Sequence, residues 1–212
     1  MTRCARCRLP ERWCICSGQR EIPCPLEIDV LMHPREQHRP SSTGHLIHRV
    51  MPRSRHRLWQ HDRKFSAADI RVPGRETWVL HPHGETMPAG PAPESIHVVL
   101  LDGAWSETAT MARDTVAWGR RISLPMTGES RFWLRDQQEG ARFSTVEALI
   151  FVLRAGGLQA AAEALQLQLE LHVYAHLRAR GRKEAAEEFL LQSPLPAALP
   201  EVLAQLTERR RR

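Results

Sequence analysis

Short apolar runs alternate along the chain with longer segments in which apolar residues recur every three or four positions. Runs of strand length lie at residues 26–32, 78–80, 96–101 and 121–124. The run at 96–101 is rich in β-branched residues and is broken only by His97, which predicts a strand buried on both faces. Helical spacing is found from residue 106, after residue 145, and from residue 158 to about 191, with an interruption near Gly181. This alternation predicts a parallel α/β sheet with helices on both faces and a helical C-terminal flank.

Polar and glycine-rich stretches between these runs predict the loops. His33-Pro34 ends the first strand, and the segment from Ser41 to Gly44 resembles a turn that enters a helix. Residues 84–93 are rich in Pro, Gly and Ala and are predicted to form a loop. Ser144 or Thr145 is placed to cap the helix that follows, with Glu147 able to complete a capping box.

Length and composition favour one substantial core with a small appended module. The chain has 212 residues, of which 42% are hydrophobic and 25% charged, as in an ordinary globular protein. No apolar run is long enough to cross a bilayer and no early segment resembles a signal peptide, so we expect a cytoplasmic location. We predict three segments: residues 1–25 as a metal-binding knuckle, 26–192 as the main domain, and 193–212 as a C-terminal helix with a basic tail.

The positive charge of the chain comes almost entirely from arginine. The formal net charge is +6, and Lys64 and Lys183 are the only lysines. A bias in genomic base composition is one explanation; the other is phosphate binding, because arginine pairs with phosphate in a two-pronged way. The run at 49–64 holds many Arg and His residues around Trp59. It is interpreted either as a solvated face or as a phosphate-tracking surface, with the candidate RNA contacts Arg53, Arg55 and Arg57.

Four cysteines near the N-terminus have the spacing of a zinc site. Cys4, Cys7, Cys14 and Cys16 lie within thirteen positions. Zinc binds four thiolates that converge at about 2.3 Å, and such a closed site has a structural role. A disulfide framework fits a reduced compartment poorly, and a redox pair does not account for the second pair of cysteines. The fifth cysteine, Cys24, is interpreted as a bystander.

The segment Asp102-Gly103-Ala104-Trp105 joins the predicted central strand to a helix. Asp102 therefore lies at the carboxyl edge of a parallel sheet, where ligands bind in open α/β folds. From the local sequence alone, capping of the helix by Asp102 is an equally good interpretation. Trp105 is interpreted as a packing anchor.

With these segments in order, the chain resembles the DTW-domain family of tRNA-uridine aminocarboxypropyltransferases, from Cys4 to about Ala155. The resemblance rests on five elements in the family's order: the cysteine cluster, His33-Pro34 with Ser42-Thr43-Gly44, Asp102 to Trp105, Phe132 to Arg135, and Ser144-Thr145-Val146-Glu147-Ala148. Two positions depart from the pattern. Ala104 stands where the family usually has Thr, and Ser42 stands where it often has Asn.

The resemblance implies a SPOUT-like, knotted parallel sheet and transfer of the 3-amino-3-carboxypropyl group of S-adenosylmethionine to N3 of a uridine in tRNA. Asp102 is then the candidate catalytic carboxylate that accepts or orients the N3 proton. Arg135 is expected near the carboxylate of the transferred group. The residues expected to bind the cofactor are Thr43, Leu101, Gly103, Trp105, Leu124, Leu134, Arg135, Phe143, Ser144, Thr145 and Glu147.

The resemblance also indicates tRNA as the partner and a monomer. Structural zinc is expected from the cysteine spacing, and no membrane partner is expected because no apolar run is long enough. Two other functions stay open at this point: an S-adenosylmethionine-dependent RNA methyltransferase, and a non-catalytic zinc-containing RNA-binding protein, which the missing hydroxyl at Ala104 allows.

Overall fold

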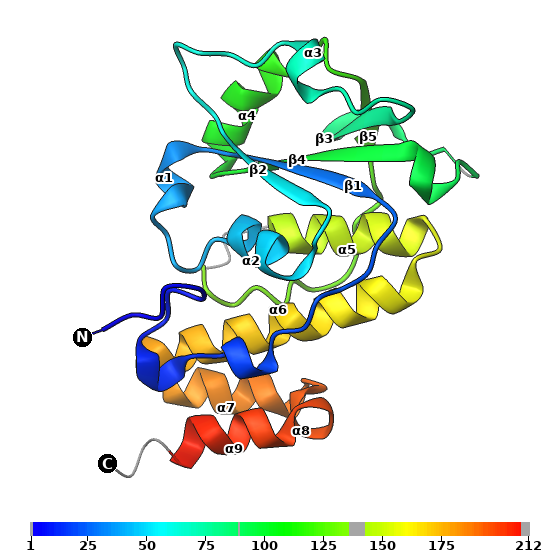
Figure 1. Cartoon of the computed structure of the whole chain (residues 1–212). Helices are drawn as coiled ribbons and strands as arrows, with labels where there is room; N and C mark the ends of the chain where they lie inside the picture. The colour runs from blue at the N-terminus through cyan, green and yellow to red at the C-terminus, as the bar shows by residue number, and fades with distance from the viewer. Residues whose placement is uncertain (1, 89, 136–142, 209–212) are drawn as a thin grey trace.

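A five-stranded parallel sheet forms the centre of the protein, in the strand order β2-β1-β4-β3-β5 (Figure 1). The computed structural model describes residues 2–88, 90–135 and 143–208. The strands are β1 (Glu27–Met32), β2 (Ser54–Leu58), β3 (Glu76–Thr86), β4 (Ile96–Asp102) and β5 (Arg120–Ser123). The α-helices are α1 (Pro34–Gln37), α2 (Thr43–Val50), α3 (Ala67–Ile70), α4 (Trp105–Asp114), α5 (Thr145–Ala155), α6 (Gln159–Ala179), α7 (Lys183–Leu191), α8 (Leu195–Ala198) and α9 (Pro200–Glu208). Three short 3-10 helices are η1 (Glu11–Trp13), η2 (Cys16–Gly18) and η3 (Pro93–Ser95).

Both faces of the sheet are covered by helices, as the alternation of elements predicts. Because successive side chains of a strand point to opposite faces, Val98 and Leu100 of β4 join one apolar cluster and Val99 joins the other. The larger cluster lies under α2, α5 and α6, and the smaller one lies under α3 and α4 (Figure 1). β4 is therefore buried on both faces, which explains its almost uninterrupted apolar sequence.

The N-terminal segment and the C-terminal helices share the larger core. Trp13 and Ile15 of the N-terminal segment belong to the same cluster as Phe189 of α7 and Leu206 of α9. Figure 1 shows the N-terminal segment beside α6, with α7, α8 and α9 on the side of α6 that faces away from the sheet. One continuous core thus joins the three predicted segments.

The structure confirms the predicted strands at 26–32, 96–101 and 121–124 and the helices that begin near 106, 145 and 158. It also differs from the sequence predictions at two places. The arginine-rich run contains β2, which pairs with β1 in register from Ser54 to Leu58. The predicted loop at 84–93 begins later, because β3 continues to Thr86.

A buried layer of charged and polar groups around the Asp29 carboxylate explains how the polar sequence of β2 forms a strand. Asp29 of β1 is 0% exposed and accepts hydrogen bonds of 2.7 Å from Nε of both Arg55 and Arg57. His97 of β4 lies 3.4 Å from the same carboxylate and 3.2 Å from Oγ1 of Thr77. Burial alone would raise the pKa of Asp29, but the hydrogen bonds from His97, Arg57 and Arg55 lower it to about 2.

This layer predicts a specific loss of stability in acid. A carboxyl whose pKa falls from 3.8 to about 2 on folding stabilises the folded state fully above pH 3.8 and loses that contribution as the pH falls through about 2. The shift corresponds to about 2 kcal/mol. The difference in unfolding free energy between wild type and Asp29→Asn, measured by urea denaturation, should be constant at pH 5 to 7 and shrink by about that amount toward pH 2. A difference that stays unchanged over the whole range would contradict the assignment.

Candidate functional site

A cavity of about 480 Å³ opens at the carboxyl edge of the sheet, around the ends of β3, β4 and β5. Parallel α/β sheets bind ligands at this edge, and small-molecule sites usually measure about 300–1,000 Å³. Nine of the eleven predicted cofactor-binding residues line it: Thr43, Leu101, Gly103, Trp105, Leu124, Arg135, Phe143, Ser144 and Thr145. Leu134 and Glu147 are buried instead, the first in the larger core and the second under the loop that precedes α5.

Asp102 lies at the end of β4 and joins three segments beneath the cavity. Its Oδ2 accepts a hydrogen bond of 2.8 Å from Ser42, and its Oδ1 accepts one of 2.6 Å from Thr145. A Cβ at Gly44 would lie 2.6 Å from Oδ2, so only glycine lets α2 approach the carboxylate this closely. Thr145 lines the cavity, whereas Asp102 is 2% exposed and lies behind it. The Thr145 hydroxyl therefore connects the Asp102 carboxylate to the cavity by a hydrogen bond.

The loop before α5 is fixed by a capping box, as its sequence predicts. Ser144 Oγ accepts a hydrogen bond from the backbone of Glu147, and Glu147 Oε2 accepts one of 2.6 Å from the backbone of Ser144. Glu147 also accepts hydrogen bonds from Ser130 Oγ at 3.0 Å and from the backbone of Arg131 at 2.7 Å. Its carboxylate thus holds two cavity loops together from below.

Two histidines at the cavity come from a part of β3 that sequence reasoning missed. Leu80 and Glu85 both lie opposite Ile122 of β5, so the intervening residues bulge out of the ladder and bring His81 and His83 to the cavity wall. A Cβ at Gly84 would lie 2.6 Å from the backbone carbon of Ile122, which requires glycine there. The available signal was His81-Pro82 directly after an apolar run.

The hydrogen bond that His81 accepts indicates which of its two ring nitrogens carries the proton. The backbone N–H of His83 donates to His81 Nδ1 at 3.1 Å. Burial, together with the charge of Arg121, lowers the pKa of His81, which favours the neutral ring at pH 7. A neutral ring that accepts at Nδ1 carries its proton on Nε2. His81 therefore offers a hydrogen-bond donor.

Arg135 brings a positive charge to the cavity. Its guanidinium group lies 3.4 Å from Oε1 of Glu36, a fully buried residue of α1 that also pairs with Arg39. Burial and the neighbouring Asp102 raise the pKa of Glu36. The side chain of Arg135 is 49% exposed, so it retains donors for an anionic group in the cavity.

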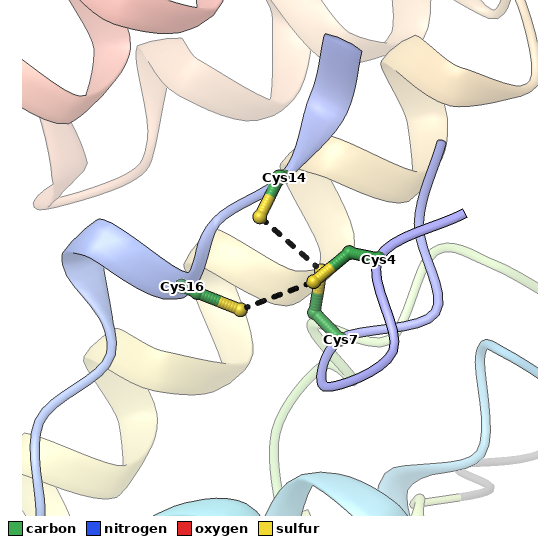
Figure 2. A group of neighbouring side chains, drawn as sticks. All are labelled: Cys4, Cys7, Cys14 and Cys16. Atoms are coloured by element: carbon green, nitrogen blue, oxygen red, sulfur yellow. Dashed lines mark hydrogen bonds between the residues drawn. The ribbon is translucent and has the colours of Figure 1, made fainter. Parts of the chain in front are cut away.

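The four N-terminal cysteines converge away from this cavity, beside α6. Their sulfur atoms all lie within 4.8 Å of one another, with 3.6 Å between Cys4 and Cys16 and 3.8 Å between Cys7 and Cys14 (Figure 2). Four thiolates at about 2.3 Å from a tetrahedral zinc ion would be separated by about 3.8 Å. Arg8, at φ 62°, reverses the chain after Cys7. The donor set and its geometry therefore fit zinc.

The three predicted RNA contacts lie on a different part of the molecule, at or beside β2. Arg53 pairs with Glu27 at 2.6 Å, and Arg55 and Arg57 share Asp29. All three charges are thus opposed by carboxylates within the fold.

A comparison with known protein families matches residues 1–177 to the DTW domain. The chain belongs to the DTW domain family. This family is associated with tRNA-modifying enzymes. No solved structure gives a significant match to the chain. Within the part of the chain that the structure describes, no helix has both the length and the apolar character needed to cross a membrane.

The DTW motif occupies the start of α4. Gly103 and Trp105 line the cavity, and Ala104 is the N-cap residue, with φ −66° and ψ 158°. Glu107 accepts a hydrogen bond of 2.7 Å from the Ala104 backbone, which is one half of a capping box. The interpretation of Trp105 as a packing anchor is wrong, because its side chain is 51% exposed. As the first residue of α4, it stands at the rim of the cavity.

Restoring Thr at position 104 should stabilise the protein. A Thr side chain at the N-cap accepts a hydrogen bond from the backbone of the first helical turn, which Ala cannot do. Ala104→Thr is expected to raise the free energy of unfolding by about 1 kcal/mol in urea denaturation. Ala104→Val has the same shape without the hydroxyl and serves as the control. An equal gain in both variants would show that the effect is not capping.

Proposed function

We propose that this DTW protein transfers the 3-amino-3-carboxypropyl group of S-adenosylmethionine to N3 of a uridine in tRNA. The observation that carries the proposal is the Asp102–Thr145 hydrogen bond, which connects a buried carboxylate to a cavity that also contains Arg135. Membership of the DTW family supports a role in tRNA modification.

The cavity residues suit the proposed cofactor. The walls are apolar at Leu80, Leu101 and Leu124, while hydroxyl groups come from Thr43, Ser144 and Thr145. An apolar site with a few directed polar groups is typical of cofactor sites. Arg135 supplies a cation for the carboxylate of the transferred group. We extend the proposal to the knotted, SPOUT-like form of the sheet that the family resemblance implies, and to structural zinc at Cys4, Cys7, Cys14 and Cys16.

The proposed step requires a proton acceptor and an aligned carbon. When bound, S-adenosylmethionine supplies a carbon next to its positive sulfur, and that C–S bond breaks as the C–N bond to uridine forms, with the bonding electrons passing to sulfur. In the proposed step Thr145 Oγ1 accepts the N3 proton while it donates its own proton to Asp102 Oδ1, and the 2.6 Å hydrogen bond between them supports this path. Asp102 is then the final proton acceptor, acting through Thr145.

His81 has a role in selecting the base. Its Nε2–H matches a carbonyl oxygen of uracil, and that oxygen gains negative charge as N3 loses its proton. Trp105, exposed at the rim, offers an aromatic surface on which an unstacked base can rest.

The deciding experiment is nucleoside mass spectrometry of unmodified tRNA incubated with the purified protein and S-adenosylmethionine. The expected product is a uridine with the mass of the aminocarboxypropyl group added, together with methylthioadenosine. A mass increase of one methyl group would establish a methyltransferase instead. Binding of tRNA without any binding of S-adenosylmethionine in calorimetry would establish a non-catalytic RNA-binding protein.

A further inference from the structure

Two distant segments of the chain bring a group of arginines to one surface. The N-terminal segment carries Arg3, Arg6 and Arg8 around the cysteine cluster, and the end of α6 with the turn after it carries Arg180 and Arg182. Figure 1 shows the N-terminal segment beside the C-terminal end of α6, on the same side of the molecule as the carboxyl ends of the strands. We call these five residues the knuckle arginines.

Contacts within the fold confirm that the two segments are neighbours. Arg178 of α6 lies 5.2 Å from the ring centroid of Trp13, and Arg12 lies 4.9 Å from the same ring. The buried His176 of α6 is influenced by both segments: burial and the charges of Arg180, Arg49 and Arg3 lower its pKa to about 3. Positive charges from both segments therefore act on the same side chain, His176.

Backbone carbonyl groups accept hydrogen bonds from two of the knuckle arginines. Arg3 donates to the carbonyl of Arg8 at 2.9 Å, and Arg180 donates to the carbonyl of Leu134 at 2.7 Å. Among the residues that the structure describes, none of the five pairs with a carboxylate. The carbonyl contacts orient the guanidinium groups of Arg3 and Arg180, whose remaining N–H groups can donate to an anion.

This surface is continuous with the cavity. Arg180 holds the backbone of Leu134, and the next residue, Arg135, lines the cavity wall. A polyanion lying along the knuckle arginines would therefore meet the backbone segment that carries Arg135 into the cavity wall.

We infer that the knuckle arginines bind the phosphate backbone of the RNA whose base enters the cavity. The inference rests on the proposed function, since it takes RNA as the substrate. Stabilisation of the C-terminal end of α6 by nearby cations accounts for Arg180. It does not account for Arg3, Arg6 and Arg8, which lie outside that helix. The arginines at β2 differ in this respect, because Glu27 and Asp29 already oppose them.

The test compares two double substitutions with the same change in charge. Arg6→Gln/Arg182→Gln removes two exposed knuckle arginines, and Arg71→Gln/Arg113→Gln removes two exposed arginines near α3 and α4. The dissociation constant for an unmodified tRNA transcript is measured over a range of salt concentrations. We expect the knuckle variant to bind about ten-fold more weakly at low salt, with a salt slope less steep by about 1.4–1.8, as for two lost phosphate contacts. The control should match wild type.

Several outcomes would overturn the inference. Equal weakening in both double variants would indicate a general charge effect, and wild-type affinity in the knuckle variant would exclude these arginines. A larger loss in Arg53→Gln than in the knuckle variant would assign the RNA to the β2 edge. Failure of the proposed function has a separate signature: wild-type protein that binds tRNA through the knuckle arginines but adds no aminocarboxypropyl group in the nucleoside assay.

Discussion

Cys7→Ser is expected to release zinc and to destabilise the whole protein, not the N-terminal segment alone. Cys7 is 0% exposed and its cluster packs against the same core as α6, α7 and α9. Structural zinc contributes folding free energy directly, so loss of one ligand should cost about 3 kcal/mol or more. For a protein of this size, that loss lowers the melting temperature by about 6–12 °C. Zinc content by mass spectrometry and thermal unfolding by circular dichroism provide the measurements.

Cys24→Ala is the matched control, since Cys24 is also buried but lies outside the four-sulfur cluster. It should retain one zinc ion per chain. Wild-type protein that contains no zinc after purification in zinc-supplemented medium would contradict the assignment, as would a Cys7→Ser variant that keeps its full zinc content.

Asp102→Asn should reduce aminocarboxypropyl transfer by about 10²–10⁴-fold, the usual contribution of a positioned proton acceptor. Thr145→Val, which keeps the shape and removes the hydroxyl, should cause a loss of the same order because it interrupts the path from the cavity to Asp102. Single-turnover rates of methylthioadenosine release measure both effects. Binding of S-adenosylmethionine by calorimetry should change little in Asp102→Asn, because Asp102 does not line the cavity.

The conservative variant Thr145→Ser separates proton transfer from simple support of the loop. It retains the hydroxyl and should restore the rate to within about ten-fold of wild type, whereas a purely steric role would favour Val over Ser. Ser42→Ala removes the other hydrogen bond of Asp102, which does not come from a cavity-lining residue, and should affect the rate much less. Near-normal turnover in Asp102→Asn would end the assignment.

The sequence predicts the central part of the site well because local and global preferences agree there. The apolar run of β4 needs burial on both faces, and the following Asp-Gly pair can only stand at the sheet edge. Ser144 and Glu147 form the capping box that their spacing predicts. Nine of the residues that the family resemblance implies for the cofactor line one cavity.

The features that sequence reasoning missed depend on contacts between distant residues. β2 was not predicted as a strand because its polar sequence resembles that of a solvated face. Arg55 and Arg57 pair with Asp29, which lies on another strand and cannot be recognised as their partner from the local sequence. The exposure of Trp105 depends on where α4 begins relative to the sheet edge, which its local sequence does not specify. Likewise, the role of Arg180 beside Leu134 depends on how α6 ends.

The bulge in β3 also bears on how this protein can evolve. Leu80 and Glu85 both lie opposite Ile122, so the residues between them contribute nothing to the register of the sheet. Insertions or deletions there would reshape one wall of the cavity while the strands on either side kept their pairing. Selection could therefore alter which base is accepted by changing the length of this segment, without disturbing the buried carboxylate or the core.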